Sequence, residues 1–168
     1  MKKVLVIIAM FIGVLSYAQQ EIKIDVLDAL ALKTLDISYE YYISDHSSIG
    51  LSGLVNLESK SADFRYNEKQ VLTPYFRHSF TRKPNWNHFG ELFFSLNSGD
   101  AELPLLEGSN EKQYESYTDG ALGIAIGSKY VSEGGFVIDI YGGLGRNLFS
   151  DNSPAVVPRI GINVGYRF

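Results

Sequence analysis

The sequence ends in RIGINVGYRF, residues Arg159 to Phe168, and this stretch decides the fold. Apolar or aromatic residues occupy every second position: Ile160, Ile162, Val164, Tyr166 and Phe168. The positions between them are charged, polar or glycine. Because successive side chains of a β-strand point to opposite faces, this alternation predicts a strand that is apolar on one face and polar on the other.

The same alternation recurs toward the N-terminus, in segments separated by clusters of Gly, Asn, Asp, Ser and Pro. It predicts eight strands, within residues 22–26, 35–41, 49–57, 72–80, 90–96, 122–130, 136–144 and 158–168. The more apolar face of these segments carries no Asp, Glu, Lys or Arg, although 20% of the chain is charged. The charges lie on the opposite face: Lys23, Asp25, Asp36, Glu40, Glu58, Lys69, Arg77, Glu91, Lys129, Asp139, Arg159 and Arg167.

This distribution of charge indicates which face of the strands points outward. An ordinary soluble core would bury the charged face only at a large cost in free energy. A transmembrane β-barrel has the reverse arrangement, because its outer band meets lipid while its lumen is polar. The sequence therefore predicts an all-β fold, an eight-stranded antiparallel transmembrane up-and-down β-barrel.

The lengths of the connections fit this fold. Short connections are expected at residues 44–47, 81–87 and 132–135, and longer ones at 59–67, 98–119 and 146–155. Short periplasmic turns that alternate with longer extracellular loops are typical of such barrels. The first connection, residues 29–33, is short and breaks the rule. Leu27, Leu30 and Ala31 have helical spacing there, so the first hairpin is expected to be the least regular element.

Aromatic residues at the strand ends form a further pattern. If the N-terminus is periplasmic, five outward aromatic side chains fall at one level and form an interfacial girdle. They are Tyr41, Phe80, Tyr130, Phe136 and Phe168.

The N-terminus has the features of a secretory signal peptide. Lys2 and Lys3 precede an apolar run from Val4 to Leu15, and small residues stand at the expected cleavage site. Cleavage is expected between Ala18 and Gln19, which leaves residues 19–168 as one barrel domain. Loss of the two lysines takes the formal net charge from −4 to −6, which argues against a nucleic-acid partner. The absence of cysteine from the sequence excludes disulfides and cysteine-based metal sites.

The ending of the chain resembles the C-terminal targeting signal of bacterial outer-membrane proteins. By that resemblance, the barrel assembly machinery reads Ile160, Ile162, Val164, Tyr166 and Phe168. The mature chain also resembles a family of small eight-stranded outer-membrane barrels of unassigned function. The motifs that carry this likeness are SYE (38–40), TPYFR (73–77), GRNLF (145–149) and GYRF (165–168). The resemblance implies an outer-membrane location among its lipids, and it implies no catalytic residue, cofactor or metal.

The interior of an eight-stranded barrel is just wide enough for side chains to fill it. Inward acids and bases are expected to pair there, because an unpaired buried charge is costly. Small inward residues are expected to leave room for Tyr75, Phe89, Phe93, Tyr141 and the arginines. These small residues are Gly50, Ser52, Gly123, Ala125, Gly127, Gly143, Gly145, Gly161 and Gly165. The leading hypothesis is a non-enzymatic integral outer-membrane barrel with a structural or surface-contact role and no wide pore.

Two other classes of protein remain open. Lipid A deacylases are barrel enzymes that use a His-x-Ser pair and a Glu, and His46, Ser48 and Glu58 have a comparable spacing. On the predicted topology, however, His46 and Glu58 lie at opposite ends of a strand, too far apart for one site. A soluble lipocalin-like barrel would instead place its apolar residues inside and bind a ligand there.

The long connection 98–119 is the expected surface for an extracellular partner, since binding residues concentrate on loops held by a rigid scaffold. Its acidic residues could contact a divalent cation, but they lack the spacing of a calcium loop, so a solvated loop is expected. These residues are Asp100, Glu102, Glu107, Glu111 and Glu115.

Overall fold

The computed structural model describes residues 19–57, 68–81, 83–102, 114–150 and 153–168. These residues form a closed barrel of eight antiparallel strands, in which each strand pairs with the next in sequence and the first closes on the last. The strands are β1 (Gln20–Asp25), β2 (Thr34–Tyr42), β3 (Ser47–Asn56), β4 (Glu68–Ser79), β5 (Trp86–Glu102), β6 (Tyr114–Val131), β7 (Phe136–Asn147) and β8 (Val156–Arg167). The predicted fold class is confirmed.

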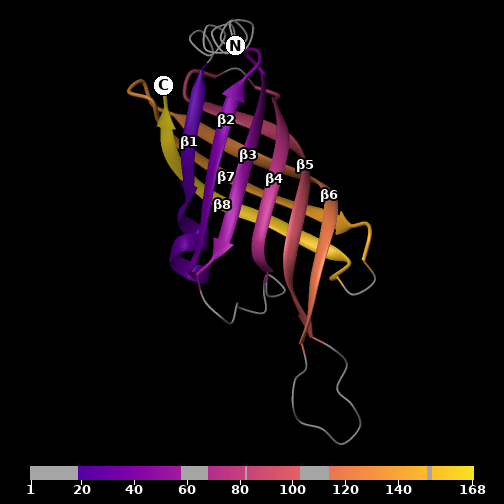
Figure 1. The fold of residues 1–168 in the computed structure, drawn as a ribbon. Coiled ribbons are helices and arrows are strands. Elements are labelled where there is room, and N and C mark those ends of the chain that lie inside the picture. Colours follow the sequence, from indigo (N-terminus) through magenta and orange to yellow (C-terminus); the bar gives the residue numbers. More distant parts are fainter. Residues whose placement is uncertain (1–18, 58–67, 82, 103–113, 151–152) are drawn as a thin grey trace, which may run out of the picture.

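Both ends of the described chain lie at one rim of the barrel (Figure 1). We call this rim the turn end, because the short connections 43–46, 80–85 and 132–135 lie there as well. The strands β1, β3, β5 and β7 end at or beyond the other rim, which we call the loop end. The expected alternation of short and long connections is thus present.

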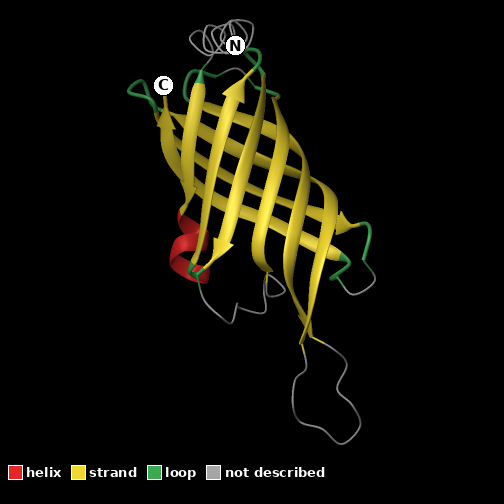
Figure 2. Cartoon of the chain, viewed as in Figure 1, coloured by secondary structure: helices red, strands yellow, loops and turns green. Residues whose placement is uncertain are grey.

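A short π-helical segment, η1 (Asp28–Leu32), joins β1 to β2 at the loop end (Figure 2). It ends at Lys33, whose left-handed backbone conformation (φ 50°) turns the chain into β2. The helical spacing noted in this segment is therefore real, and the first connection is an irregular one. No helix of the described residues is both long and apolar enough to cross a membrane.

The outer wall of the barrel is apolar and its interior is charged. Large hydrophobic side chains face outward, with Ile124 67% and Ile126 72% exposed. Lys23, Glu40 and Asp139, in contrast, are at most 1% exposed and point into the lumen. The inside-out pattern inferred from the alternation is therefore confirmed.

Inward glycines make room for inward aromatic rings, as expected. A Cβ atom added to Gly50 would lie 2.2 Å from Cζ of Tyr75, and one added to Gly127 would lie 2.5 Å from Cζ of Phe89. Each ring therefore occupies the space that the absent side chain leaves on the facing strand. Phe93, 1% exposed, packs with Tyr75 and Ala125 into a small hydrophobic core inside the barrel.

The position of Lys69 differs from the prediction. Its side chain was expected in the lumen, but it is 56% exposed and pairs with Asp100 outside. The register of β4 against β5 shifts between Glu68 and Gln70, which marks a β-bulge or irregularity. An irregularity of this kind turns the side chains beyond it to the opposite face of the sheet. Glu68 is buried as a result, and the prediction for Lys69 was wrong.

The connection 98–119 is also shorter than predicted. Ser98 to Glu102 and Tyr114 to Asp119 are strand residues, and Glu102 pairs with Tyr114. The β5–β6 ladder continues past the point where β7 ends its pairing with β6, at Ala121 and Asn147. β5 and β6 therefore form a hairpin that extends away from the loop end (Figure 1).

Candidate functional site

The most elaborate group of functional side chains is a network of charges in the lumen, centred on Glu40 of β2. Its carboxylate accepts hydrogen bonds from Nζ of Lys129 (2.8 Å), Nη1 of Arg77 (3.1 Å) and the Ser48 hydroxyl (2.6 Å), and also from Nζ of Lys23. These donors come from β6, β4, β3 and β1 respectively. One carboxylate thus ties together strands from opposite sides of the barrel.

Arg77 and Arg159 extend the network toward the middle of the barrel. Glu91 of β5 accepts a hydrogen bond from Nε of Arg77 (2.6 Å) and one from Nε of Arg159 (2.7 Å). Aromatic rings cover both guanidinium groups. The Arg77 guanidinium lies 4.3 Å from the ring centroid of Phe89, and the Arg159 guanidinium lies 5.3 Å from that of Phe93. Such contacts stabilise a desolvated cation.

Glu21 and Arg167 close the network at the turn end. Glu21 accepts hydrogen bonds from Nζ of Lys129 (2.7 Å) and Nε of Arg167 (2.8 Å). The Tyr42 hydroxyl lies 2.8 Å from both Lys129 Nζ and Arg167 Nη2. The expected pairing of inward acids and bases is therefore present in this network.

Three carboxylates of this network could together hold a metal ion. Ligand atoms of Glu21, Glu40 and Asp139 lie within 4.8 Å of one another. However, the ammonium group of Lys23 contacts all three, at 3.3 Å from Glu21 and 2.8 Å from Asp139. Lys129 and Arg77 add further positive charge. Because the chain supplies its own cations, the cluster does not fit a metal site.

A small cavity remains in the lumen beyond this network. It measures about 20 Å³, room for about one water molecule. Asp36, Ser95, Tyr141 and Arg159 are among its lining residues. The lumen therefore offers a water-sized space there rather than a ligand pocket of the usual several hundred Å³.

The residues compared with a deacylase site do not come together in the described part of the chain. The Ser48 hydroxyl donates to Glu40 in the lumen. The ring of His46, in the turn between β2 and β3, lies 6.2 Å from that of His78. Glu58 lies outside the described residues. The arrangement of His46 and Ser48 does not support a nucleophile activated by a histidine.

Asp119 organises the loop end, a role that the sequence analysis missed. Its carboxylate accepts hydrogen bonds from the backbone amides of Gly120 (2.6 Å), Phe149 (3.0 Å) and Ser150 (3.0 Å), and from the Ser153 hydroxyl. Burial alone would raise the pKa of Asp119, but these hydrogen bonds outweigh it and lower the pKa. Asp119 thereby fastens the β7–β8 connection to β6.

The acidic residues noted in the long connection do not form a described cation site. Asp100 accepts hydrogen bonds from Nζ of Lys69 (2.8 Å) and the Ser116 hydroxyl (2.8 Å). These bonds lower the pKa of Asp100 and brace β5 against both neighbouring strands. Glu107 and Glu111 lie outside the described residues.

The residues of the predicted assembly signal all lie on the outer wall. Tyr166 is 52% and Phe168 62% exposed, while Ile160, Ile162 and Val164 are at least partly exposed. The backbone of Phe168 exchanges two hydrogen bonds with Gln20, which closes the barrel at the turn end. Residues 1–18, the predicted signal peptide, lie outside the described chain.

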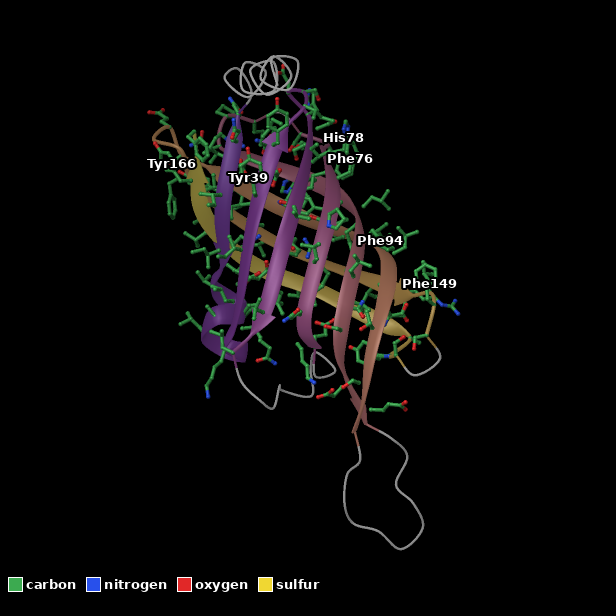
Figure 3. All side chains as sticks on the ribbon, viewed as in Figure 1. Tyr39, Phe76, His78, Phe94, Phe149 and Tyr166 are labelled. Atoms are coloured by element: carbon green, nitrogen blue, oxygen red, sulfur yellow. The ribbon has the colours of Figure 1, made fainter. Side chains whose placement is uncertain are left out.

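Outward aromatic residues mark both rims. Tyr39, Phe76, His78 and Tyr166 lie toward the turn end, and Phe94 and Phe149 lie closer to the loop end (Figure 3). The five aromatic residues of the predicted girdle also lie at the turn end, each near the end of a strand or directly after it. They are Tyr41, Phe80, Tyr130, Phe136 and Phe168.

No protein-family model matches this sequence, and no curated protein matches it in sequence. Solved structures do match in fold. The N-terminal β-barrel domain of Pseudomonas aeruginosa OprF aligns with a TM-score of 0.56 at 12% identity, over 90% of this chain and 96% of that one. The Yersinia pestis outer membrane protein Ail, in a phospholipid nanodisc, aligns with a TM-score of 0.50 at 15% identity, over 90% and 99% of the two chains. The chain therefore has the closed eight-stranded β-barrel fold of the small outer-membrane proteins.

Proposed function

We propose that this chain is a non-enzymatic integral protein of the bacterial outer membrane, with no wide pore and a surface-contact role. The observation that carries the proposal is the inside-out barrel. Its outer wall exposes Ile124, Ile126 and Leu144 by 62% or more, while Lys23, Glu40 and Asp139 are enclosed. An apolar wall around a charged lumen is stable where lipid covers the wall.

Export and assembly are the second part of the proposal. Residues 1–18 direct the chain out of the cytoplasm and are removed between Ala18 and Gln19. The barrel assembly machinery then reads Ile160, Ile162, Val164, Tyr166 and Phe168. The outward position of these side chains supports this role, because a factor that binds the unclosed edge can reach that face.

Fractionation of cells that express the chain tests the location. We expect the protein in the outer-membrane fraction, with a faster gel band before heating than after it, because a closed barrel resists detergent. Deletion of Phe168 should lower the amount of this heat-sensitive band while the signal peptide is still removed. A soluble periplasmic protein, or an unchanged level of folded barrel in the deletion strain, would contradict the proposal.

The surface-contact role is assigned to the β5–β6 hairpin. Beyond Ala121, no described strand pairs with β6 on the side opposite β5. Among the described strands, residues 114–118 of β6 therefore pair with β5 alone and form an edge strand of the hairpin that extends beyond the barrel wall. Such an edge can add a strand from a partner through its backbone groups.

Shortening this hairpin tests the role. Replacement of residues 100–116 by a Gly-Ser turn removes the projection and leaves the pairs within the barrel wall intact. We expect the shortened chain to reach the outer membrane as a heat-sensitive band, and its cells to lose adhesion to protein-coated surfaces. Equal adhesion of cells with the full and shortened hairpins would contradict the assignment.

A further inference from the structure

The outer wall carries one open groove near the turn end, formed by β5, β6, β7 and the residues after β4. Phe80, Trp86, His88, Ile126, Ser128 and Gly142 are among its lining residues. Its volume of about 630 Å³ lies within the range of about 300–1,000 Å³ that is typical of small-molecule sites.

Two outward glycines, Gly142 in the groove and Gly90 next to the groove residue Ile126, have opposite surroundings. A Cβ added to Gly90 would lie 2.8 Å from Cζ of Phe80, so the phenyl ring covers that glycine. A Cβ added to Gly142 would meet no described atom within 4 Å. Gly142 stands between the outward residues Ile140 and Leu144 of β7 and leaves a depression that no described side chain of the protein fills.

Polar groups gather at the end of the groove nearer the rim. Nδ1 of His88 lies 2.7 Å from the Ser128 hydroxyl. When that hydroxyl donates to Nδ1, the other ring nitrogen carries the proton and can donate. Neither this Nε2 nor the indole nitrogen of Trp86 has a hydrogen-bond partner among the described residues. Lys83, an exposed cation, precedes Trp86 by three residues in the same turn-end connection.

These groups form successive rows from the rim toward the middle of the wall. Trp86 pairs with Tyr130, and their ring centroids are 5.3 Å apart. His88 pairs with Ser128 in the next outward row, and Ile126 pairs with Gly142 in the row after that. Rows are two residues apart, or about 6.6–6.8 Å along a strand. The groove thus passes from an aromatic row through a polar row to an apolar depression.

We propose that this groove binds one glycerophospholipid, with an acyl chain over Gly142 and the phosphate and ester oxygens near His88, Trp86 and Lys83. The proposal rests on the proposed membrane location. The order of the rows matches the order of groups in a phospholipid, since tryptophan favours the headgroup level and the acyl chain fills an apolar space. The positive charge of Lys83 and the available donors complement an anionic phosphate.

Fluorescence of Trp86 reports directly on this groove, because it is the only tryptophan in the sequence. The purified chain is held in detergent micelles, and phosphatidylglycerol with brominated acyl chains is added in increasing mole fraction. Bromine quenches tryptophan on contact. We expect the wild-type chain to reach half-maximal quenching at about one tenth of the mole fraction that the Gly142→Leu variant requires, a tenfold difference in affinity.

Gly53→Leu is the matched control. Gly53 is also an outward glycine with no described atom within 4 Å of an added Cβ, and it lies in a different depression beside Leu72 and Leu96. This variant should follow the wild-type curve. At the polar end, His88→Ala should shift the curve toward that of Gly142→Leu, whereas His46→Ala, a histidine outside the groove, should not.

Identical quenching curves for the wild type and Gly142→Leu would overturn the lipid site and leave the membrane barrel standing. A shift for Gly53→Leu as large as that for Gly142→Leu would also overturn it, because the effect would then belong to the wall in general. A chain that stays folded in buffer without detergent or lipid would overturn both the lipid site and the proposed membrane location.

Discussion

Ile124 and Ala125 are neighbours on β6 that face opposite sides of the wall. Ile124 is 67% exposed on the outer face, and Ala125 is 3% exposed beside Tyr75 and Phe93 in the lumen. Ile124→Arg should destabilise the barrel by about 2–4 kcal/mol, the cost of a cation near the middle of a bilayer. Ala125→Ser should have a mild effect. The free energy of unfolding in lipid vesicles measures both, and equal losses would mean that the faces are assigned wrongly.

Glu91 stands between two buried guanidinium groups, those of Arg77 and Arg159. Glu91→Ala leaves both cations without this partner, and the loss of one member of a buried pair costs about 3–5 kcal/mol. Urea unfolding in vesicles measures this cost. The exposed pair of Lys69 and Asp100 is the control, since Lys69→Ala should cost less than about 1 kcal/mol. A cost for Glu91→Ala no larger than that of the control would contradict a tightly paired lumen.

At the residue scale, alternation predicted which side chains are enclosed wherever the strands are regular. Lys23, Glu40, Arg77 and Asp139 face the lumen because parity alone decides their direction. Lys69 does not, because the β4–β5 register shifts beside it and the sequence carries no clear mark of that shift. The partners within the network depend on distances across the barrel, which alternation along one strand cannot provide.

At the scale of elements, Asp119 on β6 fixes the conformation of the β7–β8 connection. Asp119→Ala removes the acceptor of the Phe149 and Ser150 amides, so those two amides should exchange with deuterium faster than in the wild type. Amides in the middle of β6 should be unaffected and serve as the internal control. Unchanged exchange at Phe149 and Ser150 would show that other contacts hold the connection.

The pH dependence of this connection follows from the lowered pKa of Asp119. A carboxyl whose pKa is lower in the folded than in the unfolded chain stabilises the fold above the unfolded value of about 3.9. That contribution is lost only as the pH falls through the lower pKa that Asp119 has in the folded chain. Protection of the two amides should therefore stay constant between about pH 8 and pH 5 and weaken in stronger acid.

The strands were predicted more accurately than the connections between them, because hydrophobic alternation marks a strand only where one of its faces is apolar. The periodic part of each strand was identified, yet β5 and β6 run on through Asp100 and Ser116, where the polar composition had indicated a loop. Polar residues on both faces suit a hairpin that stands in water. Period-two alternation of hydrophobicity disappears in such a hairpin, so its strands resemble a loop in sequence.

At the scale of the whole molecule, the paired charges predict a closed lumen. Glu40, Lys23, Arg77 and Lys129 meet inside a barrel with only eight strands, and aromatic rings cover the arginines. Purified protein in a planar bilayer should show no stable open channel. Steady conductance with large unitary steps would contradict this account and make the protein a small porin.

The central claim is that the apolar wall faces lipid and the charged face is enclosed. Its most direct test compares the folding of the urea-unfolded chain on dilution into phospholipid vesicles with folding on dilution into buffer alone. The account predicts that a compact form, migrating faster on an unheated gel than on a heated one, appears only with vesicles, together with a β-sheet circular dichroism spectrum. A folded, monomeric barrel in buffer without lipid or detergent would contradict the claim and favour a soluble, lipocalin-like protein.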